Sequence, residues 1–288
     1  MICTVGTFYS DLTALVTGAA SGLGRALAQR LAADGCHVAL CDVKETDLLS
    51  LGEELRTKYP DIRVSTHLSN IGEKASMMEM RQEVLKIHGG INFLFNNAGV
   101  TLCDSVRDGH FADFEHVVNV NLMGAVFGTK IFLKDLESQE TAHIINISSM
   151  FGAVAYPNHT AYCTSKFGLR GFSESLSIEL RHSHVHAHCV LPGFIRTSLL
   201  DNGKLIDVSA IIDTIEEFKE GFDRFGILSA SQAANKILSQ VARKKSQIII
   251  GADGKCLSIV QRIFPSFYKK IFGYGIDVYS NWSRQRKS

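Results

Sequence analysis

Short runs of apolar, mostly β-branched residues alternate along the chain with longer amphipathic stretches. The short runs predict strands over Ala14–Thr17, His37–Asp42, Arg63–Leu68, Ile91–Phe95, His143–Ser148, His186–Leu191 and Gln247–Ile250. The amphipathic stretches predict helices over Leu23–Asp34, Glu45–Lys58, Glu73–His88, Phe111–Leu136, Ala161–Arg181 and Ser231–Arg243. Such alternation is typical of βαβ units with right-handed crossovers. The pattern predicts an α/β fold: a doubly wound parallel sheet of Rossmann type, about seven strands, with helices on both faces.

The chain offers no clear position at which it would divide into domains. It has four prolines and no linker rich in Ser and Gly, so we expect a single domain over residues 1–288. Two segments lie outside the alternation: residues 194–226, which follow a strand end, and the C-terminal extension, residues 252–288. Ligands of open α/β sheets bind outside the carboxyl ends of the strands. We therefore expect 194–226 to cover a substrate.

Composition narrows the class of protein. Thirty basic and 29 acidic side chains nearly cancel, which gives no reason to expect nucleic acid as a partner. Seven cysteines, an odd number with no C-x-x-C pair, favour reduced thiols over a disulfide framework or a zinc site. Met1–Asp11 lacks the features of a signal peptide, and no window reaches the roughly 18 uncharged apolar residues of a membrane span. We expect a soluble, cytoplasmic protein.

A glycine-rich segment, Thr17–Gly24, joins the first predicted strand to the first helix. Gly18 permits a tight turn, Gly22 lets the backbone approach a pyrophosphate, and Gly24 lets the helix pack against the strand. Free N–H groups and the positive end of the helix dipole favour phosphates at this position. A loop that merely turns the chain is the alternative.

The second predicted strand ends at Asp42, where an acid can bind the ribose 2′-hydroxyl of a dinucleotide. A carboxylate there repels a 2′-phosphate, and Ser21 brings no positive charge to the turn. NAD is therefore favoured over NADP as the cofactor. The alternative for Asp42 is an ordinary helix N-cap before Lys44–Leu48.

Tyr162 and Lys166 are four residues apart, so on a helix both project from one face. A nearby positive charge favours tyrosinate, and a shift of about 3 pKa units corresponds to roughly 4 kcal/mol. Tyr162 could then exchange a proton with an alcohol or ketone while hydride moves. Ser149 follows a buried strand at the edge where ligands bind, so its hydroxyl could hold the substrate oxygen. A surface Tyr–Lys pair and a loop-capping serine are the alternatives.

With these motifs in this order, the chain resembles the single-domain branch of the short-chain dehydrogenase/reductase family over roughly residues 11 to 255. The family's T-G-x-x-x-G-x-G stands here as Thr17–Gly24 and its N-N-A-G as Asn96–Gly99. Its P-G followed by a hydroxyl residue matches Pro192, Gly193 and Thr197. Its tetrad matches Asn121, Ser149, Tyr162 and Lys166.

The resemblance implies roles for further residues. Lys166 should also bind the nicotinamide ribose, and Asn121 should hold a water that links Lys166 to solvent. The residues expected at the cofactor are Gly18, Ser21, Gly22, Leu23, Gly24, Asp42, Asn70, Ile71, Asn97, Ala98, Gly99, Tyr162, Lys166, Pro192, Gly193, Ile195 and Thr197. Asn97 and Gly99 should lie along the adenosine half, and Ile195 and Thr197 near the carboxamide. Asn121 as a helix-kink residue and Asn97 as a turn former are the alternatives.

One position departs from the family pattern. The third strand usually ends in an acid that meets the adenine amino group, whereas this chain has Ser69, Asn70 and Ile71. Asn70 keeps a carbonyl acceptor but loses the charge, so adenine binding should survive with altered affinity.

Two further patterns carry weaker hypotheses. Histidines alternate from His182 to His188, which suggests a metal if the segment is one strand, but it spans a helix end and a strand start. In the tail, Ile259, Ile263, Phe267 and Ile271 recur every four residues among basic and aromatic side chains. This pattern could lie on a membrane surface. Packing over the protein's own pocket or a partner subunit is favoured, because Pro265 interrupts the helical pattern.

The sequence therefore predicts an enzyme that transfers hydride between NAD(H) and a small-molecule alcohol, ketone or aldehyde. Apolar residues in 194–226 favour a lipophilic substrate: Phe194, Leu199, Leu200, Ile211, Ile212, Ile215, Phe218 and Phe222. The alternatives are an NADP-dependent carbonyl reductase and a dinucleotide-binding regulatory protein without turnover. The resemblance also implies a homodimer or homotetramer, formed through the helices that carry Asn121 and Tyr162.

Overall fold

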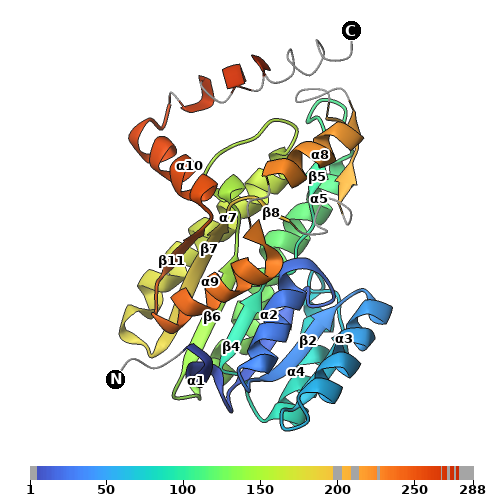
Figure 1. Ribbon diagram of the computed structural model, residues 1–288, viewed down its shortest axis with the longest axis vertical. Helices are drawn as coiled ribbons and strands as arrows, with labels where there is room; N and C mark the ends of the chain where they lie inside the picture. Colours follow the sequence, from blue (N-terminus) through green and yellow to red (C-terminus); the bar gives the residue numbers. More distant parts are fainter. Residues whose placement is uncertain are drawn as a thin grey trace.

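A seven-stranded parallel sheet runs through the centre of the molecule (Figure 1). The computed structural model describes residues 5–196, 203–208, 214–225, 228–266, 268–270, 273–275 and 277–278. The sheet contains β1 (Thr13–Thr17), β2 (His37–Asp42), β3 (Val64–Leu68), β4 (Phe93–Asn96), β6 (Ala142–Ile147), β7 (Val185–Pro192) and β11 (Gln247–Ile250). The strand order is β11-β7-β6-β4-β1-β2-β3, so the chain reverses its winding direction between β1 and β4. The predicted fold class is confirmed.

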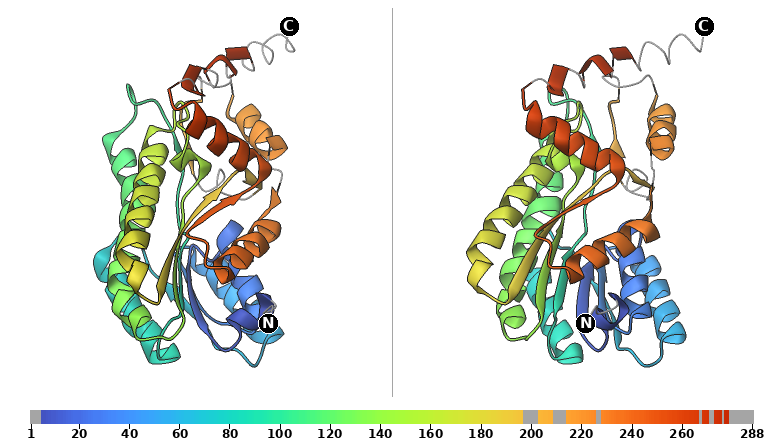
Figure 2. Two further views of the ribbon diagram at one scale, coloured as in Figure 1. Left: turned by 90° about the vertical axis from the view of Figure 1, so that its left-hand side faces the viewer. Right: turned by 60° about the vertical axis from the view of Figure 1, so that its left-hand side comes forward.

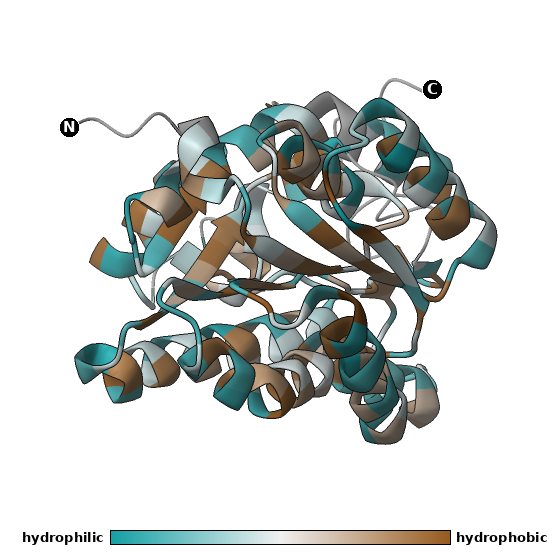
Figure 3. Cartoon of the chain, turned by 90° about the horizontal axis from the view of Figure 1, so that it is seen from below, coloured by the Kyte–Doolittle hydropathy of each residue, from teal (hydrophilic) through white to brown (hydrophobic). Residues whose placement is uncertain are grey.

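Helices cover both faces of this sheet, as Figures 2 and 3 show. One face is covered by α1 (Val5–Tyr9), α2 (Gly22–Ala33), α3 (Glu45–Lys58) and α9 (Ala230–Ala242). The other is covered by α4 (Lys74–His88), α5 (Phe111–Val118), α6 (Gly124–Glu137) and α7 (Thr160–Glu179). Alternate residues of each strand enter opposite cores, as Leu15 and its neighbours Ala14 and Val16 do. Burial on both faces explains why the strands are almost continuously apolar.

The long helix predicted over Phe111–Leu136 is interrupted. Between α5 and α6 the chain makes a π-helical turn, η1 (Asn119–Met123), which contains Asn121. Such turns insert an extra residue and are frequent at functional sites. In the described part of the chain, Phe111–Glu137 also meets the length and hydropathy of a membrane span. Within the protein 44% of this apolar stretch is buried, and Val120, Phe132 and Leu136 belong to the core on this face of the sheet.

Short elements at the carboxyl edge of the sheet were not predicted. They are β5 (Leu102–Cys103), β8 (Ile195–Arg196), β9 (Lys204–Leu205), β10 (Leu228–Ser229), α8 (Ile215–Phe225) and α10 (Ala252–Ile263), together with the 3-10 turn η2 (Met150–Gly152). β8 pairs with β10, and β5 with β9, both in parallel. These pairings hold parts of 194–226 against the edge where the sequence predicts the ligand crevice.

The alternating histidines do not form one ladder. His182 ends a 3-10 turn, and only His186 and His188 lie on β7, where they share a face with His143 of β6. Nδ1 of His143 is 2.8 Å from Nε2 of His188. Among the residues that the structure describes, no group of three or more His, Cys, Asp or Glu is arranged to hold a metal ion.

Candidate active site

The glycine-rich turn has the backbone that the sequence predicts. Gly18 and Gly22 have positive φ angles of 66° and 53°, which side chains rarely permit. A Cβ on Gly24 would overlap the carbonyl oxygen of Gly18, so helix α2 can approach β1 this closely only with glycine there. The first turn of α2 contains no acidic residue. The turn therefore fits a diphosphate, because neither side chains nor negative charges obstruct it.

Asn97 fixes this turn from the end of β4. Its Nδ2 donates to the carbonyl of Thr17 at 2.8 Å, and its backbone N–H donates to the Thr17 hydroxyl at 3.0 Å. The N–H of Ala98 donates to the same hydroxyl at 3.1 Å. Asn97 thus fixes the conformation of the glycine-rich turn. Its contact with the adenosine half of the cofactor stays a prediction.

Asp42 lies beside the turn, at the end of β2. Its Oδ2 accepts the N–H of Ala20 at 2.9 Å, and its Oδ1 accepts those of Val43 and Lys44. The alternative reading as a helix N-cap fails, because α3 begins after Lys44 and no side chain caps it. The carboxylate is half-buried and faces the turn, and its contact with a ribose stays a prediction.

Asn70 differs in part from the expectation. Its Oδ1 accepts the N–H of Gly72 at 3.1 Å, and its Nδ2 donates to Glu73 at 2.7 Å. The acceptor that was expected to face adenine is therefore engaged by the loop itself. Ile71 is 7% exposed and packs in the core against Gly124 of α6.

Tyr162 and Lys166 project from one face of α7 into the protein, with exposed fractions of 6% and 4%. The Lys166 Nζ lies 5.7 Å from the centre of the Tyr162 ring. It donates a hydrogen bond of 2.9 Å to the carbonyl of Ile147, the last residue of β6. This contact ties α7 to the strand end that carries Ser149.

Ser149 follows β6 in an extended conformation and accepts the N–H of Phe151 at 3.1 Å. Its side chain also hydrogen-bonds the phenol of Tyr162, which favours the ionised form. The structure thus brings Ser149, Tyr162 and Lys166 together at the carboxyl edge of the sheet, as predicted from their spacing.

The expected acidity of the phenol is not found in the chain without a cofactor. Burial raises the pKa of Tyr162 to about 12, although the Ser149 hydrogen bond opposes the shift. Burial lowers the pKa of Lys166 to about 8. The lysine therefore loses its proton well before the phenol ionises, and it cannot then stabilise a tyrosinate. At neutral pH the free chain holds a neutral phenol beside a largely protonated amine.

Asn121 sits in the π turn and is 1% exposed. Its Oδ1 accepts the N–H of Val100 at 2.8 Å, and its Nδ2 donates to the carbonyl of Val100 and to Ser165. A Cβ on Gly99 would lie 3.1 Å from this Oδ1 and 3.4 Å from the Lys166 Nζ. Asn121 and Lys166 therefore meet across Gly99. The water expected at Asn121 stays a prediction.

The strand end of β7 completes the expected cofactor set. Pro192 ends the strand, Gly193 donates its N–H to Ile250 at 2.8 Å, and Ile195 is buried in β8. Thr197 lies outside the described residues. Asp253 of α10, which sequence reasoning missed, accepts the N–H of Phe194 at 2.7 Å.

Aromatic side chains lie beside Tyr162, and of these the sequence pointed only to Phe194. The ring centre of Phe151 lies 6.2 Å from those of Tyr162 and Phe194, and 4.9 Å from that of Tyr156. His159 completes the group, and burial lowers its pKa. Apart from Phe194, these residues occupy loops without hydrophobic periodicity, so no sequence pattern marks them. They place an apolar, aromatic wall next to the phenol.

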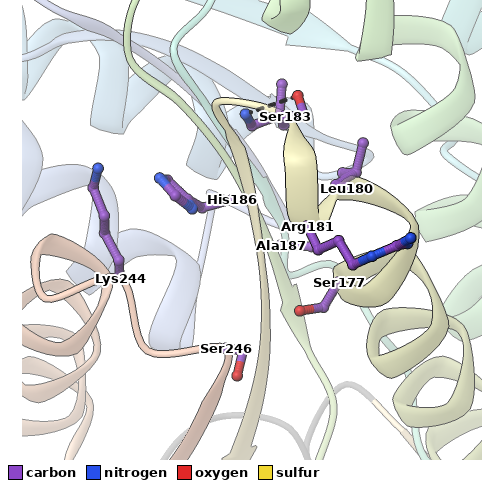
Figure 4. Close-up of a pocket in the computed structure, with 9 residues that line it drawn as sticks. Ser177, Leu180, Arg181, Ser183, His186, Ala187, Lys244 and Ser246 are labelled. Carbon is purple, nitrogen blue, oxygen red and sulfur yellow. Dashed lines mark hydrogen bonds between the residues drawn. The ribbon is translucent and has the colours of Figure 1, made fainter.

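A separate hollow of about 200 Å³ lies at the opposite edge of the sheet, near the start of β7 (Figure 4). His186 and Lys244 lie on one side of the strand, and Arg181 and Ser177 on the other. It contains none of the residues predicted for catalysis or cofactor binding.

A glycine turn at the switch point of a doubly wound sheet, with an acid at the end of β2, defines a dinucleotide-binding α/β protein. A family model described as short chain dehydrogenase matches residues 12–204. SadH of Mycobacterium tuberculosis, described provisionally as an oxidoreductase, is 33% identical over 280 residues, covering 96% of this chain and 99% of SadH. The chain belongs to the short-chain dehydrogenase/reductase family of oxidoreductases.

Solved structures share the fold. A short-chain dehydrogenase/reductase from Burkholderia phymatum in complex with NAD superimposes with a TM-score of 0.79 at 24% identity, covering 88% of this chain and 94% of that one. An alcohol dehydrogenase from Thermococcus sibiricus complexed with 5-hydroxy-NADP gives a TM-score of 0.71 at 22% identity, with coverages of 83% and 95%. At these identities the likeness bears on the fold alone.

Proposed function

We propose that the protein interconverts an alcohol and a ketone or aldehyde with NAD(H) as the hydride carrier. The observation that carries the proposal is the buried phenol of Tyr162, hydrogen-bonded by Ser149 and four residues from Lys166, at the sheet edge next to the glycine turn. A bound nicotinamide supplies or accepts the hydride and, when oxidised, adds a positive charge. The chain's own residues then have to position the substrate oxygen and move one proton.

The proton moves at the Tyr162 oxygen. With a pKa of about 12 in the free chain, the phenol is protonated at neutral pH and is ready to donate to a carbonyl oxygen. In the oxidising direction it must first be made acidic by positive charge nearby. Ser149 holds the substrate oxygen. Lys166, which is largely protonated at neutral pH, binds the ribose and stabilises negative charge as it develops on the phenol oxygen during proton transfer. Asn121, which lies beside Gly99, would hold the water through which Lys166 exchanges protons with solvent.

NAD rather than NADP is the proposed cofactor. The carboxylate of Asp42 is held by three backbone N–H groups next to the turn, so it cannot easily swing away from a ribose. A 2′-phosphate there would meet a fixed negative charge. Of two solved structures with this fold, one contains NAD and the other 5-hydroxy-NADP, so the fold alone does not decide between the two cofactors.

A lipophilic substrate is supported by the wall of Phe151, Tyr156 and Phe194 beside the phenol. Residues 194–226 are proposed to cover it. Their ends are fixed by the β8–β10 pair, and Asn158 Nδ2 donates to the carbonyl of Asp207 at 3.0 Å. Leu199, Leu200, Ile211 and Ile212, and the side chains of Phe218 and Phe222, lie outside the described residues.

The test is a panel of alcohols and ketones of graded size and polarity, followed by NADH absorbance. We expect turnover with a substrate of the panel and a loss of about 10²-fold or more in kcat for Tyr162→Phe, with NADH binding retained. Turnover that is unaffected by Tyr162→Phe would sink the mechanism. Tight NADH binding without turnover across the panel would instead favour a regulatory protein, the second candidate.

Compartment and assembly are proposals as well. All six described cysteines are free thiols, which supports a reducing, cytosol-like compartment. A homodimer or homotetramer through α5–α6 and α7 is supported by exposed apolar residues on those helices, Phe111, Phe167 and Ile178. Size measurement in solution tests this, and a monomer at all concentrations would refute it.

A further inference from the structure

Helix α10 presents an apolar stripe with positive charges on its outward side. Ile259 and Ile263, four residues apart, are 58% and 61% exposed, and Phe264 directly after the helix is 51% exposed. Lys255 and Arg262, both exposed, lie on the same side at helical spacing from Ile259. An apolar stripe flanked by cations is the arrangement of helices that lie at a bilayer surface.

The inward side of α10 is fixed to the candidate active site. A Cβ on Gly254 would lie 3.2 Å from the side chain of Met150, one residue after Ser149. Asp253 accepts the N–H of Phe194, as described above. Further along, the hydroxyl of Tyr268, which is 6% exposed, accepts the N–H of Ala155 at 3.3 Å. From the sequence, the tail was expected to pack over the protein's own pocket. The inward side of α10 agrees with this expectation, but the exposed apolar stripe on its outward side is not explained by it.

Charge is distributed unevenly between this extension and the rest of the chain. Residues 252–288 contain seven Lys and Arg against two Asp and Glu, whereas the preceding 251 residues contain 23 against 27. The extension also holds the only tryptophan and six other aromatic residues. Cationic and aromatic residues together favour an interface with anionic headgroups and acyl chains.

We propose that the outward side of α10, with the extension that follows, binds the surface of an anionic lipid bilayer. Figures 1 and 2 show α10 at one end of the molecule, beyond the carboxyl edge of the sheet. Docking there leaves α10 between the lipid and the turn that carries Phe194, so a lipophilic substrate would have a short path to the site. The binding itself does not depend on the proposed hydride chemistry.

A second copy of the chain fits this surface less well. A two-fold contact would bring one extension against the other, and like charges face each other across such an interface. An anionic bilayer instead meets the positive charge with its own negative potential, and attraction falls with rising salt. The charge balance therefore selects the lipid surface.

The experiment is co-sedimentation of the full chain with vesicles of phosphatidylcholine alone and of phosphatidylcholine mixed with phosphatidylserine. We expect binding to the mixed vesicles, weakened by salt, and little binding to the neutral ones. The double variant Ile259→Asp/Ile263→Asp should lose binding by about tenfold or more. Lys255→Glu/Arg262→Glu should do the same, since each basic residue contributes about fivefold near such a surface.

Matched variants on α3 and α4 keep the test specific. Leu49→Asp/Ile87→Asp alters two apolar residues of comparable exposure, 50% and 48%, and should bind vesicles like the unaltered chain. NADH fluorescence should be the same in all variants, which shows that they fold. The proposal is overturned if the chain ignores phosphatidylserine, or if the α10 variants still bind. It is also overturned if the unaltered chain is a dimer that does not sediment with vesicles, and the α10 variants differ from it only by being monomeric.

Discussion

The carboxylate of Asp253 in α10 accepts the backbone N–H of Phe194, with 2.7 Å between Oδ2 and the nitrogen. This bond joins the C-terminal extension to the first residue of the segment proposed to cover the substrate. A Cβ on Gly193 would overlap the same carboxylate, so the turn and the acid fit closely. The other oxygen, Oδ1, is buried and makes no hydrogen bond within the described residues. Asp253 is therefore a positioning residue for the turn after β7.

Replacing Asp253 by Ala should raise the KM for substrate by about tenfold, because a charge-assisted hydrogen bond that orients Phe194 is lost. Asp253→Asn keeps a carbonyl acceptor and should restore most of the affinity. Steady-state kinetics of both variants, with NADH titration as the control for folding, test this. Equal defects in the two variants would contradict the positioning role.

Asp42→Asn should weaken the preference for NADH over NADPH by about tenfold, since it removes the negative charge and keeps an acceptor for Ala20. Fluorescence titration with both cofactors measures the ratio. Asp47→Asn, an exposed acid in the first turn of α3, is the matched control and should leave the ratio unchanged. If the unaltered chain binds NADPH more tightly, the role given to Asp42 is wrong.

The phenol of Tyr162 should stay protonated in the free chain up to high pH, because burial raises its pKa to about 12. Oxidised NAD should lower that pKa by adding positive charge in the site. The tyrosinate absorbance of the unaltered chain minus that of Tyr162→Phe, with and without NAD, reports the shift. An identical titration in both conditions would remove the electrostatic basis of the oxidation step.

Acid should destabilise the protein below the ordinary histidine pKa of 6.5. Burial lowers the pKa of His188 to about 4, and that of its partner His143 further. Nδ1 of His188 lies 2.7 Å from the carbonyl of Lys245, so the neutral His188 ring donates from Nδ1 and accepts from Nδ1 of His143 at Nε2. A proton on Nε2 of His188 would place two donors face to face. Stability is therefore complete above 6.5 and falls as the pH drops toward 4. The slope is about 1.4 kcal/mol per pH unit for each histidine.

Urea unfolding of the unaltered chain and of His188→Gln measures this slope. The variant should be less stable near neutral pH but should lose less stability on acidification. A slope that is the same in both would show that other groups govern the acid response.

The framework could be predicted from sequence because its elements are long and periodic. The bounds of the predicted strands and helices agree with the structure to within about two residues, and those of β2, α3 and β11 agree fully. The exception is the helix predicted over Phe111–Leu136, which is interrupted. The π turn at Asn119–Met123 could not be predicted, since its residues continue the apolar pattern of a helix. The two-residue strands β8 and β10 are too short to have a period and form only by pairing with each other.

The residues of the candidate site likewise include some that could be predicted from the sequence and some that could not. Ser149, Tyr162 and Lys166 could be predicted together because one strand and the next helix place them. Asp253 could not, since it meets Phe194 across 59 residues of chain. The raised pKa of Tyr162 in the chain without a nucleotide could not be predicted, because a spacing of four residues says nothing about burial.

The parallel pairing of β8 with β10 brings together the two ends of the segment that connects them. Since both ends are anchored beside the central sheet, a change in the number of residues between them has a small entropic cost, provided that the pairing of β9 with β5 is kept. If this segment covers the substrate, as proposed, it is the part to exchange when a different substrate is to be accommodated, while the glycine turn, Ser149, Tyr162 and Lys166 are left intact.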